Sequence, residues 1–202
     1  LTAGASFAQK GPKDTFNYSP LNPIVMPDVE KAELPNGLKL FLVEDHEFPT
    51  INLWILVRTG SVFDPASKVG LASITGTALR TGGTKGKTGD EIDRELDTLA
   101  ASISTGVSSN LGYLSVSALK ENFDQALSVL ADIVTEPAFS EDKIELARIQ
   151  QRTAIARRNE NIRSIASREF SKLIYGKDSP YARHTEYASI QAVTRESIVD
   201  FY

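Results

Sequence analysis

The sequence predicts an α+β fold in which a mostly antiparallel sheet is covered by helices. Segments in which apolar side chains alternate along the chain, as in half-buried strands, occur in two pairs within the 202 residues. Each pair is followed by segments in which apolar residues recur every three or four positions, as in helices that cover a sheet. A chain of this length is able to bury one sizeable core.

Four strands are predicted. Asn36-Gly37 is a strong hairpin signal, and an alternating segment follows it. In the run after Thr50, side chains at every second position share one face. Two further alternating segments flank a turn at Ser109-Asn110. We expect one mostly antiparallel sheet made of residues 38–43, 51–57, 101–107 and 111–119. The face expected to be buried in the second strand carries Ile51, Leu53, Ile55 and Val57.

Five helices are predicted from apolar spacing and end signals. Thr88 and Glu91 fit a capping box, Ser140 and Thr194 are favourable N-cap residues, and Pro137 ends the preceding helix. The predicted helices are residues 69–80, one after Thr88, one from residue 121 to before Pro137, one from Ser140 to about residue 159, and one after Thr194. The apolar face expected in the third comprises Phe123, Leu127, Leu130 and Val134.

The composition excludes several classes of function. The formal net charge is −4, so no basic field argues for a nucleic-acid partner. With no cysteine there is no disulfide, thiolate nucleophile or cysteine-based metal site. The two histidines, His46 and His184, lie far apart and lack the spacing of a metal motif. No run approaches the ~18 apolar residues of a membrane span.

The first 28 residues differ from the rest. LTAGASFAQK resembles the end of a secretory signal, with Ser6 and Ala8 placed before a cleavage point at Gln9. Four prolines then break helix and strand. We expect residues 1–28 to be a signal-peptide remnant and an extended lead-in, and the protein to be periplasmic or extracellular. The alternative is an Ala-rich N-terminus without a targeting role.

The predicted helix at residues 69–80 carries an unusual set of small residues. Ser73, Gly76 and Thr77 share one face, because positions three and four apart are neighbours on a helix. Small residues on one face permit close packing against a neighbouring element. They offer neither imidazole nor carboxylate, which a catalytic zinc requires.

The surroundings of this helix resemble the zinc-binding helix of the pitrilysin/insulinase family, the inverted zincins, whose signature is H-x-x-E-H. Gly70, Leu71 and Ala72 match the residues that precede the signature, and Gly83-Thr84 matches the turn that follows it. The resemblance places the two His and the Glu of the signature on Ser73, Gly76 and Thr77. It implies that residues 29–202 form the N-terminal half-domain of a metallopeptidase of the pitrilysin or mitochondrial processing peptidase type.

The same resemblance places the family's third ligand, a Glu on the long helix, near Thr153, where alignment is guided by Glu160-Asn161. We therefore expect no catalytic, cofactor-binding or metal-binding residue in this chain. The implied function is a non-catalytic subunit or half of a zinc-dependent peptidase assembly that encloses unfolded peptides. Its implied partner is an active H-x-x-E-H subunit or a second half-domain, and zinc is expected in that catalytic partner.

Several alternatives remain open at this point. The chain is either such a non-catalytic half or a binding or scaffold protein without a peptidase role, whereas a free-standing zinc peptidase conflicts with its residues. The segment 81–88 contains Gly-Lys-Thr, but Thr81 stands where a phosphate-binding loop needs Gly. The arginines of residues 148–163 are interpreted as a solvated face balanced by nearby glutamates, rather than as an anion site.

Overall fold

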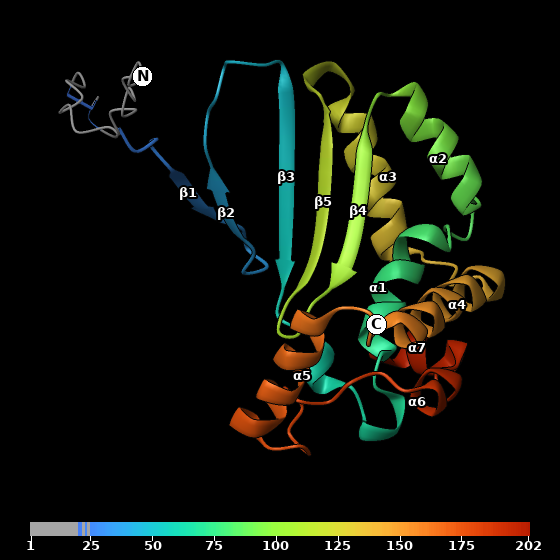
Figure 1. Ribbon diagram of the computed structural model, residues 1–202. Helices are drawn as coiled ribbons and strands as arrows, with labels where there is room; N and C mark the ends of the chain where they lie inside the picture. Colours follow the sequence, from blue (N-terminus) through green and yellow to red (C-terminus); the bar gives the residue numbers. More distant parts are fainter. Residues whose placement is uncertain (1–19, 22, 24) are drawn as a thin grey trace, which may run out of the picture. The chain divides into compact units, whose positions relative to one another are not determined.

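The computed structural model describes Pro20, Leu21, Pro23 and residues 25–202, and these form two compact units that divide between Phe48 and Pro49 (Figure 1). The predicted signal remnant and most of the lead-in lie outside the described residues. The domain boundary expected at residue 29 stays a prediction.

The first unit contains a single described hairpin. Strand β1 (Glu30–Glu33) pairs antiparallel with β2 (Lys39–Leu42). The turn between them closes as the Asn36-Gly37 signal indicates: Gly37 has a φ of 83°, and its N–H donates to the carbonyl of Leu34. The expectation that residues 38–43 share a sheet with the other three strands is wrong. Among the described strands, β2 pairs with β1, because the tight turn folds it back onto the residues before it.

The second unit contains a three-stranded antiparallel sheet in the order β3-β5-β4. Its strands are β3 (Thr50–Val57), β4 (Ser102–Val107) and β5 (Gly112–Leu119). Leu53 and Ile55 pack on the core as predicted, and Trp54 is exposed on the other face. Val57 was expected on the buried face but is 44% exposed. It is the last residue of its strand, at the edge of the core.

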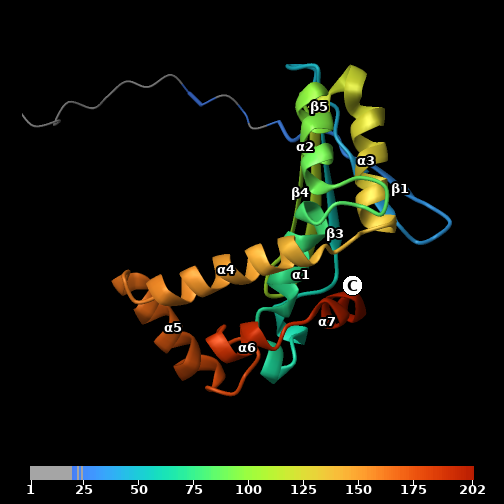
Figure 2. The same ribbon diagram turned by 90° about the vertical axis from the view of Figure 1, so that its right-hand side faces the viewer.

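Seven helices are described in this unit. In Figure 2, α3 runs along one face of the sheet, while α4 and α5 meet at a corner away from it. The helices are α1 (Leu71–Thr81), α2 (Gly89–Thr98), α3 (Phe123–Thr135), α4 (Glu141–Arg157), α5 (Ile162–Tyr175), α6 (Tyr187–Gln191) and α7 (Arg195–Phe201). Short 3-10 turns occupy Ser61–Phe63, Ala66–Lys68 and Lys120–Asn122.

The helix predictions are confirmed in their order, and two details are corrected. Thr88 and Thr194 cap α2 and α7 through their side chains, whereas the side chain of Ser140 makes no capping hydrogen bond. In α3 the buried face is rotated from the predicted one, so Leu127 is 37% exposed. Helices α5 and α6 were not predicted. The residues that α3 buries are Ala126, Val129, Leu130 and Ile133.

Two clusters of buried side chains hold the unit together, and α1 lies between them. One cluster joins the sheet to α2 and α3, with Ile92 and Val116 almost fully buried. The other joins α1 to α4, α6 and α7, with Ile74 and Ile198 fully buried. Leu79 of α1 packs against both clusters. The helix that carries Ser73, Gly76 and Thr77 is therefore held from two sides.

Candidate functional site

The start of α1 is fixed by a buried carboxylate. Asp64 is 2% exposed and accepts the N–H groups of Gly70 at 2.8 Å and Ala72 at 2.9 Å. Burial raises the pKa of the Asp64 carboxyl, and the backbone N–H groups oppose that rise. Gly70 sits at a φ of 107°, a conformation that suits glycine, and α1 begins at the next residue.

One side of α1 contacts the backbone of strand β4. The Thr105 hydroxyl donates to the carbonyl of Gly76 at 2.5 Å. A Cβ atom placed on Gly76 would lie 2.9 Å from the backbone nitrogen of Val107 and 3.0 Å from the Cα of Gly106. A Cβ atom placed on Gly106 would overlap the ring of Tyr113. Helix and strand therefore meet through two glycines, with no room for a side chain at position 76. The close packing expected from small residues is confirmed here.

The adjacent side of α1 contacts α4 through side chains. The amide Nε2 of Gln151 donates to the Ser73 hydroxyl at 2.9 Å. The Thr77 hydroxyl donates to the carbonyl of Ser73 at 3.1 Å, within its own helix. Ser73 and Thr77 are both half-buried. The structure thus brings Ser73, Gly76 and Thr77 together on α1 and adds Gln151 to them.

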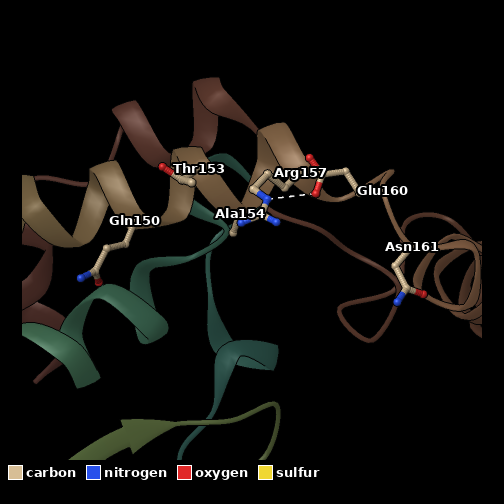
Figure 3. Close-up of a pocket in the computed structure, with 6 residues that line it drawn as sticks. All are labelled: Gln150, Thr153, Ala154, Arg157, Glu160 and Asn161. Carbon is tan, nitrogen blue, oxygen red and sulfur yellow. Dashed lines mark hydrogen bonds and ion pairs between the residues drawn. The ribbon is translucent and has the colours of Figure 1, made fainter.

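Thr153 lies on another side of α4. It is exposed, and its hydroxyl donates to the carbonyl of Ile149 at 2.9 Å. Together with Gln150 and Ala154 it lines the hollow shown in Figure 3. Positions two apart on a helix differ by about 200° in direction, so Thr153 and Gln151 do not face the same neighbour. The geometry supports Gln151, rather than Thr153, as the residue of α4 that faces the α1 positions.

The sequence carries a signal for Gln151 in the spacing of the buried residues of α4. The buried residues of α4 are Ile144, Ala147 and Ile155. Gln151 continues this series at a spacing of four, whereas Thr153 falls between its members. Thr105 and Gly106 were also missed as partners of the helix, because their contact with Gly76 depends on tertiary packing. The placement of the family's third ligand near Thr153 stays a prediction, whereas the observed contact with Ser73 is made by Gln151, two residues earlier.

The side chains at these positions do not fit a zinc ion. Ser73 and Thr77 offer neutral hydroxyls, Gln151 offers an amide, and Gly76 has no side chain to act as a base. Zinc is held by imidazole, thiolate or carboxylate ligands. In the described part of the chain, no three His, Cys, Asp or Glu side chains come close enough to hold a metal ion together.

Two other sequence features take structural roles. Lys87, the lysine of the Gly-Lys-Thr segment, pairs with Glu95 at 2.6 Å, and this pairing raises the lysine pKa. A phosphate-binding loop follows a strand, whereas this segment follows helix α1. The hollow drawn in Figure 3 lies beside the end of α4, where Arg157 pairs with Glu160 at 2.9 Å. Both of those side chains are largely exposed.

The sequence matches a known family over most of its length. The profile of the insulinase family, peptidase family M16, matches residues 39–187. The chain is 23% identical over 183 residues to the mitochondrial-processing peptidase subunit beta of Dictyostelium discoideum, covering 88% of this chain and 38% of the relative. It is 25% identical over 174 residues to a zinc protease of Rickettsia felis, covering 84% of this chain and 41% of the relative. The chain therefore spans about two fifths of these curated relatives.

Solved structures show the same fold. A peptidase M16 inactive domain from Pseudomonas fluorescens superposes with a TM-score of 0.78 at 26% identity, covering 86% of this chain and 42% of that one. A protease from Helicobacter pylori has a TM-score of 0.74 at 20% identity, covering 87% and 43%. The periplasmic protease PqqL from Escherichia coli has a TM-score of 0.72 at 16% identity, covering 99% and 22%. The matched profile and the shared α+β half-domain show that this chain belongs to the insulinase family of peptidases, family M16.

Proposed function

We propose that this chain is a non-catalytic half of an M16 peptidase assembly. The observation that carries the proposal is the contact of Gly76 with the backbone of β4, because Gly76 occupies the position of the family's catalytic Glu. A base there would need a side chain, and the nearest backbone atoms lie 2.9–3.0 Å from where its Cβ would be. The site is thus closed by packing as well as lacking its ligands.

Two further observations support the proposal. Ser73 and Thr77, which match the two His positions, make hydrogen bonds that fit a structural role. The Pseudomonas relative is itself described as an M16 inactive domain. Gln151 takes the third-ligand position in this proposal, in place of the Thr153 that sequence alignment suggested.

The partner in this proposal is a second M16 half that carries H-x-x-E-H and a zinc ion. The relatives are more than twice as long as this chain, which leaves room for such a second half within one polypeptide or in a separate subunit. Together the two halves enclose an unfolded peptide. Export to the periplasm or beyond is part of the proposal and is supported by the periplasmic neighbour PqqL. No described helix has the length and apolar character needed to cross a membrane.

The test combines metal analysis with a reconstitution assay. The natural polypeptide is purified without chelator, incubated with excess zinc, desalted and analysed for zinc per active site. We expect zinc to equal the number of H-x-x-E-H motifs present, with none held by this half. Peptide hydrolysis by the active half should then be faster with the non-catalytic half present than without it.

Two outcomes separate the alternatives. One tightly held zinc per copy of this half would contradict the proposal. Hydrolysis by the active half that does not depend on this half would instead support a scaffold without a peptidase role. A variant with Ile55→Asp, which places a charge on the buried sheet face, controls for the need of a folded half.

A further inference from the structure

A second pocket lies at the corner formed by α4, α5 and the segment before α6, outside the positions discussed so far. Its volume is about 280 Å³. Figure 2 shows the end of α4 turning into α5, whose far end leads back toward α6. The charged and titratable residues of its lining are Arg158, Arg168, Glu169, Lys172, Lys177, Arg183, His184 and Glu186.

The charge of this pocket is opposite to that of the whole chain. The chain has a formal net charge of −4, whereas five cations and two carboxylates line the pocket and leave it at +3. Both carboxylates are engaged: Arg158 holds Glu186 at 2.8 and 3.0 Å, and Lys172 holds Glu169 at 2.9 Å. Glu169 is shared with Arg168 at 3.4 Å, so the excess positive charge gathers on Arg168, Lys177 and Arg183 with one carboxylate already divided between two cations.

Arg183 is held in place by the segment that leads into α1. Its Nη1 donates to the backbone carbonyl of Asp64 at 3.2 Å. A guanidinium carries five N–H donors in a planar fork, so this single bond orients the group and leaves further donors for a ligand. Arg168 is oriented in a similar way by the side chain oxygen of Asn159, at 2.8 Å.

His184 provides an independent sign of an unfilled site at this pocket. Its Nε2 is buried, and it has no hydrogen-bond partner among the described residues. Buried polar atoms of this kind are rare, because each one costs free energy. Burial lowers the pKa of His184, and the cations Lys172, Arg168 and Arg158 lower it further, while Glu169 opposes them. The imidazole thus lies in a net positive field, and Glu186 and Lys177 complete the charged groups around it.

We propose that this pocket binds a small tetrahedral oxyanion of the phosphate class. Such an ion presents several acceptors to donors that converge from different elements, here Arg168 from α5 and Arg183 and His184 from the segment before α6. Its double charge offsets most of the excess of three, which a single carboxylate does not. The proposal does not depend on the non-catalytic role of the α1 positions.

Inorganic phosphate is the first probe, titrated into the protein by calorimetry at constant ionic strength, with chloride as the balancing anion. We expect saturable binding and a rise in the melting temperature that chloride does not produce. Lys177→Glu should weaken phosphate binding about tenfold or more, because it reverses a charge at the pocket. Arg152→Glu makes the same change in net charge at an exposed site of α4 outside the pocket, and should leave affinity unchanged. Equal weakening in the two variants, or no binding by the original protein, overturns the proposal.

Histidine NMR gives a second measurement that does not rely on a variant. The chain has two histidines, and His46 lies outside the pocket, so it serves as a reference in the same spectra. Sulfate keeps its double charge across the pH range in which histidine titrates. We expect sulfate to raise the pKa of His184, because a bound dianion stabilises the imidazolium. An unchanged His184 titration at saturating sulfate contradicts the proposal.

A third comparison identifies the source of the oxyanion. Phosphate and O-phosphoserine are titrated under the same conditions. Equal affinity indicates a site for the free ion, whereas tighter binding of O-phosphoserine indicates a site for a phosphorylated side chain. Both results support the proposed chemistry, and binding of acetate as tight as that of phosphate overturns it.

Discussion

On the side of α1 that faces β4, backbone lies against backbone, whereas on the side that faces α4 the helix meets hydrogen-bonding side chains. Gly76 and Gly106 allow the first contact, and Ser73 and Gln151 make the second. The first side tolerates no added atom without movement of the strand. On the second side the contact is made by side chains, so a substitution can change its chemistry without moving the backbone. The comparison teaches that position 76, where we propose that the family's base would stand, is closed sterically, whereas the contact at Ser73 depends on side-chain chemistry.

The largest effect is expected from Gly76→Ala. Alanine in place of glycine inside a helix would by itself stabilise by ~1 kcal/mol. Here we expect a net loss of about 2–3 kcal/mol in the free energy of unfolding, because the methyl group would overlap the backbone of β4. Urea unfolding provides the measurement.

Gly86→Ala is the matched control, since a Cβ there meets nothing within 4 Å. It should change the free energy of unfolding by no more than ~0.5 kcal/mol. If Gly76→Ala lowers the free energy of unfolding no more than this control does, position 76 is not closed by the backbone of β4.

The second prediction concerns zinc on the α4 side. A background with Ser73→His and Thr77→His supplies two imidazoles on one helical face. Adding Gln151→Glu should raise zinc affinity by about tenfold or more, because the new carboxylate faces the pair. Adding Thr153→Glu should leave affinity unchanged. Calorimetry with zinc compares the two variants, and a larger gain from Thr153→Glu would restore the alignment made from the sequence.

A smaller effect is expected from Thr105→Val, which removes the hydroxyl that donates to the carbonyl of Gly76. The loss should be about 1 kcal/mol, a typical value for one hydrogen bond of this kind. Thr153→Val removes an exposed hydroxyl that bonds only within its own helix, and serves as the control. Thermal unfolding of both variants is sufficient, and equal losses would remove the special role given to the β4 side.

The smallest effect lies in the contact between α1 and α4. A double-mutant cycle of Ser73→Ala and Gln151→Ala should give a coupling energy of about 0.5–1 kcal/mol. The cycle of Ser73→Ala with Thr153→Ala should give a coupling near zero. A coupling of similar size in both cycles would mean that the amide of Gln151 does not reach Ser73 in solution.

Features that depend on local spacing were predictable from the sequence, and those that depend on tertiary contact were not. The capping box at Thr88, the turn after Leu34 and the strand alternation around Ile55 follow from neighbouring residues. The pairing of β2 with β1 alone depends on where the hairpin folds back, which the alternation of residues does not encode. Likewise, the smallness of Gly76 was visible, but the strand that fills its place was not. The inward position of Gln151 was predictable, because it continues the spacing of the buried residues Ala147 and Ile155 on α4.

The location of Leu79 has a consequence for how the second unit opens. Because this side chain packs against both buried clusters, α1 cannot detach from one without disturbing the other. Segments that share their contacts in this way open as one cooperative unit, whereas chain segments on the surface fray separately. The amide protons of α1 are therefore expected to exchange with solvent only when the whole of residues 49–202 unfolds. The exposed helix α5, which has no buried residue, is expected to exchange through local opening instead.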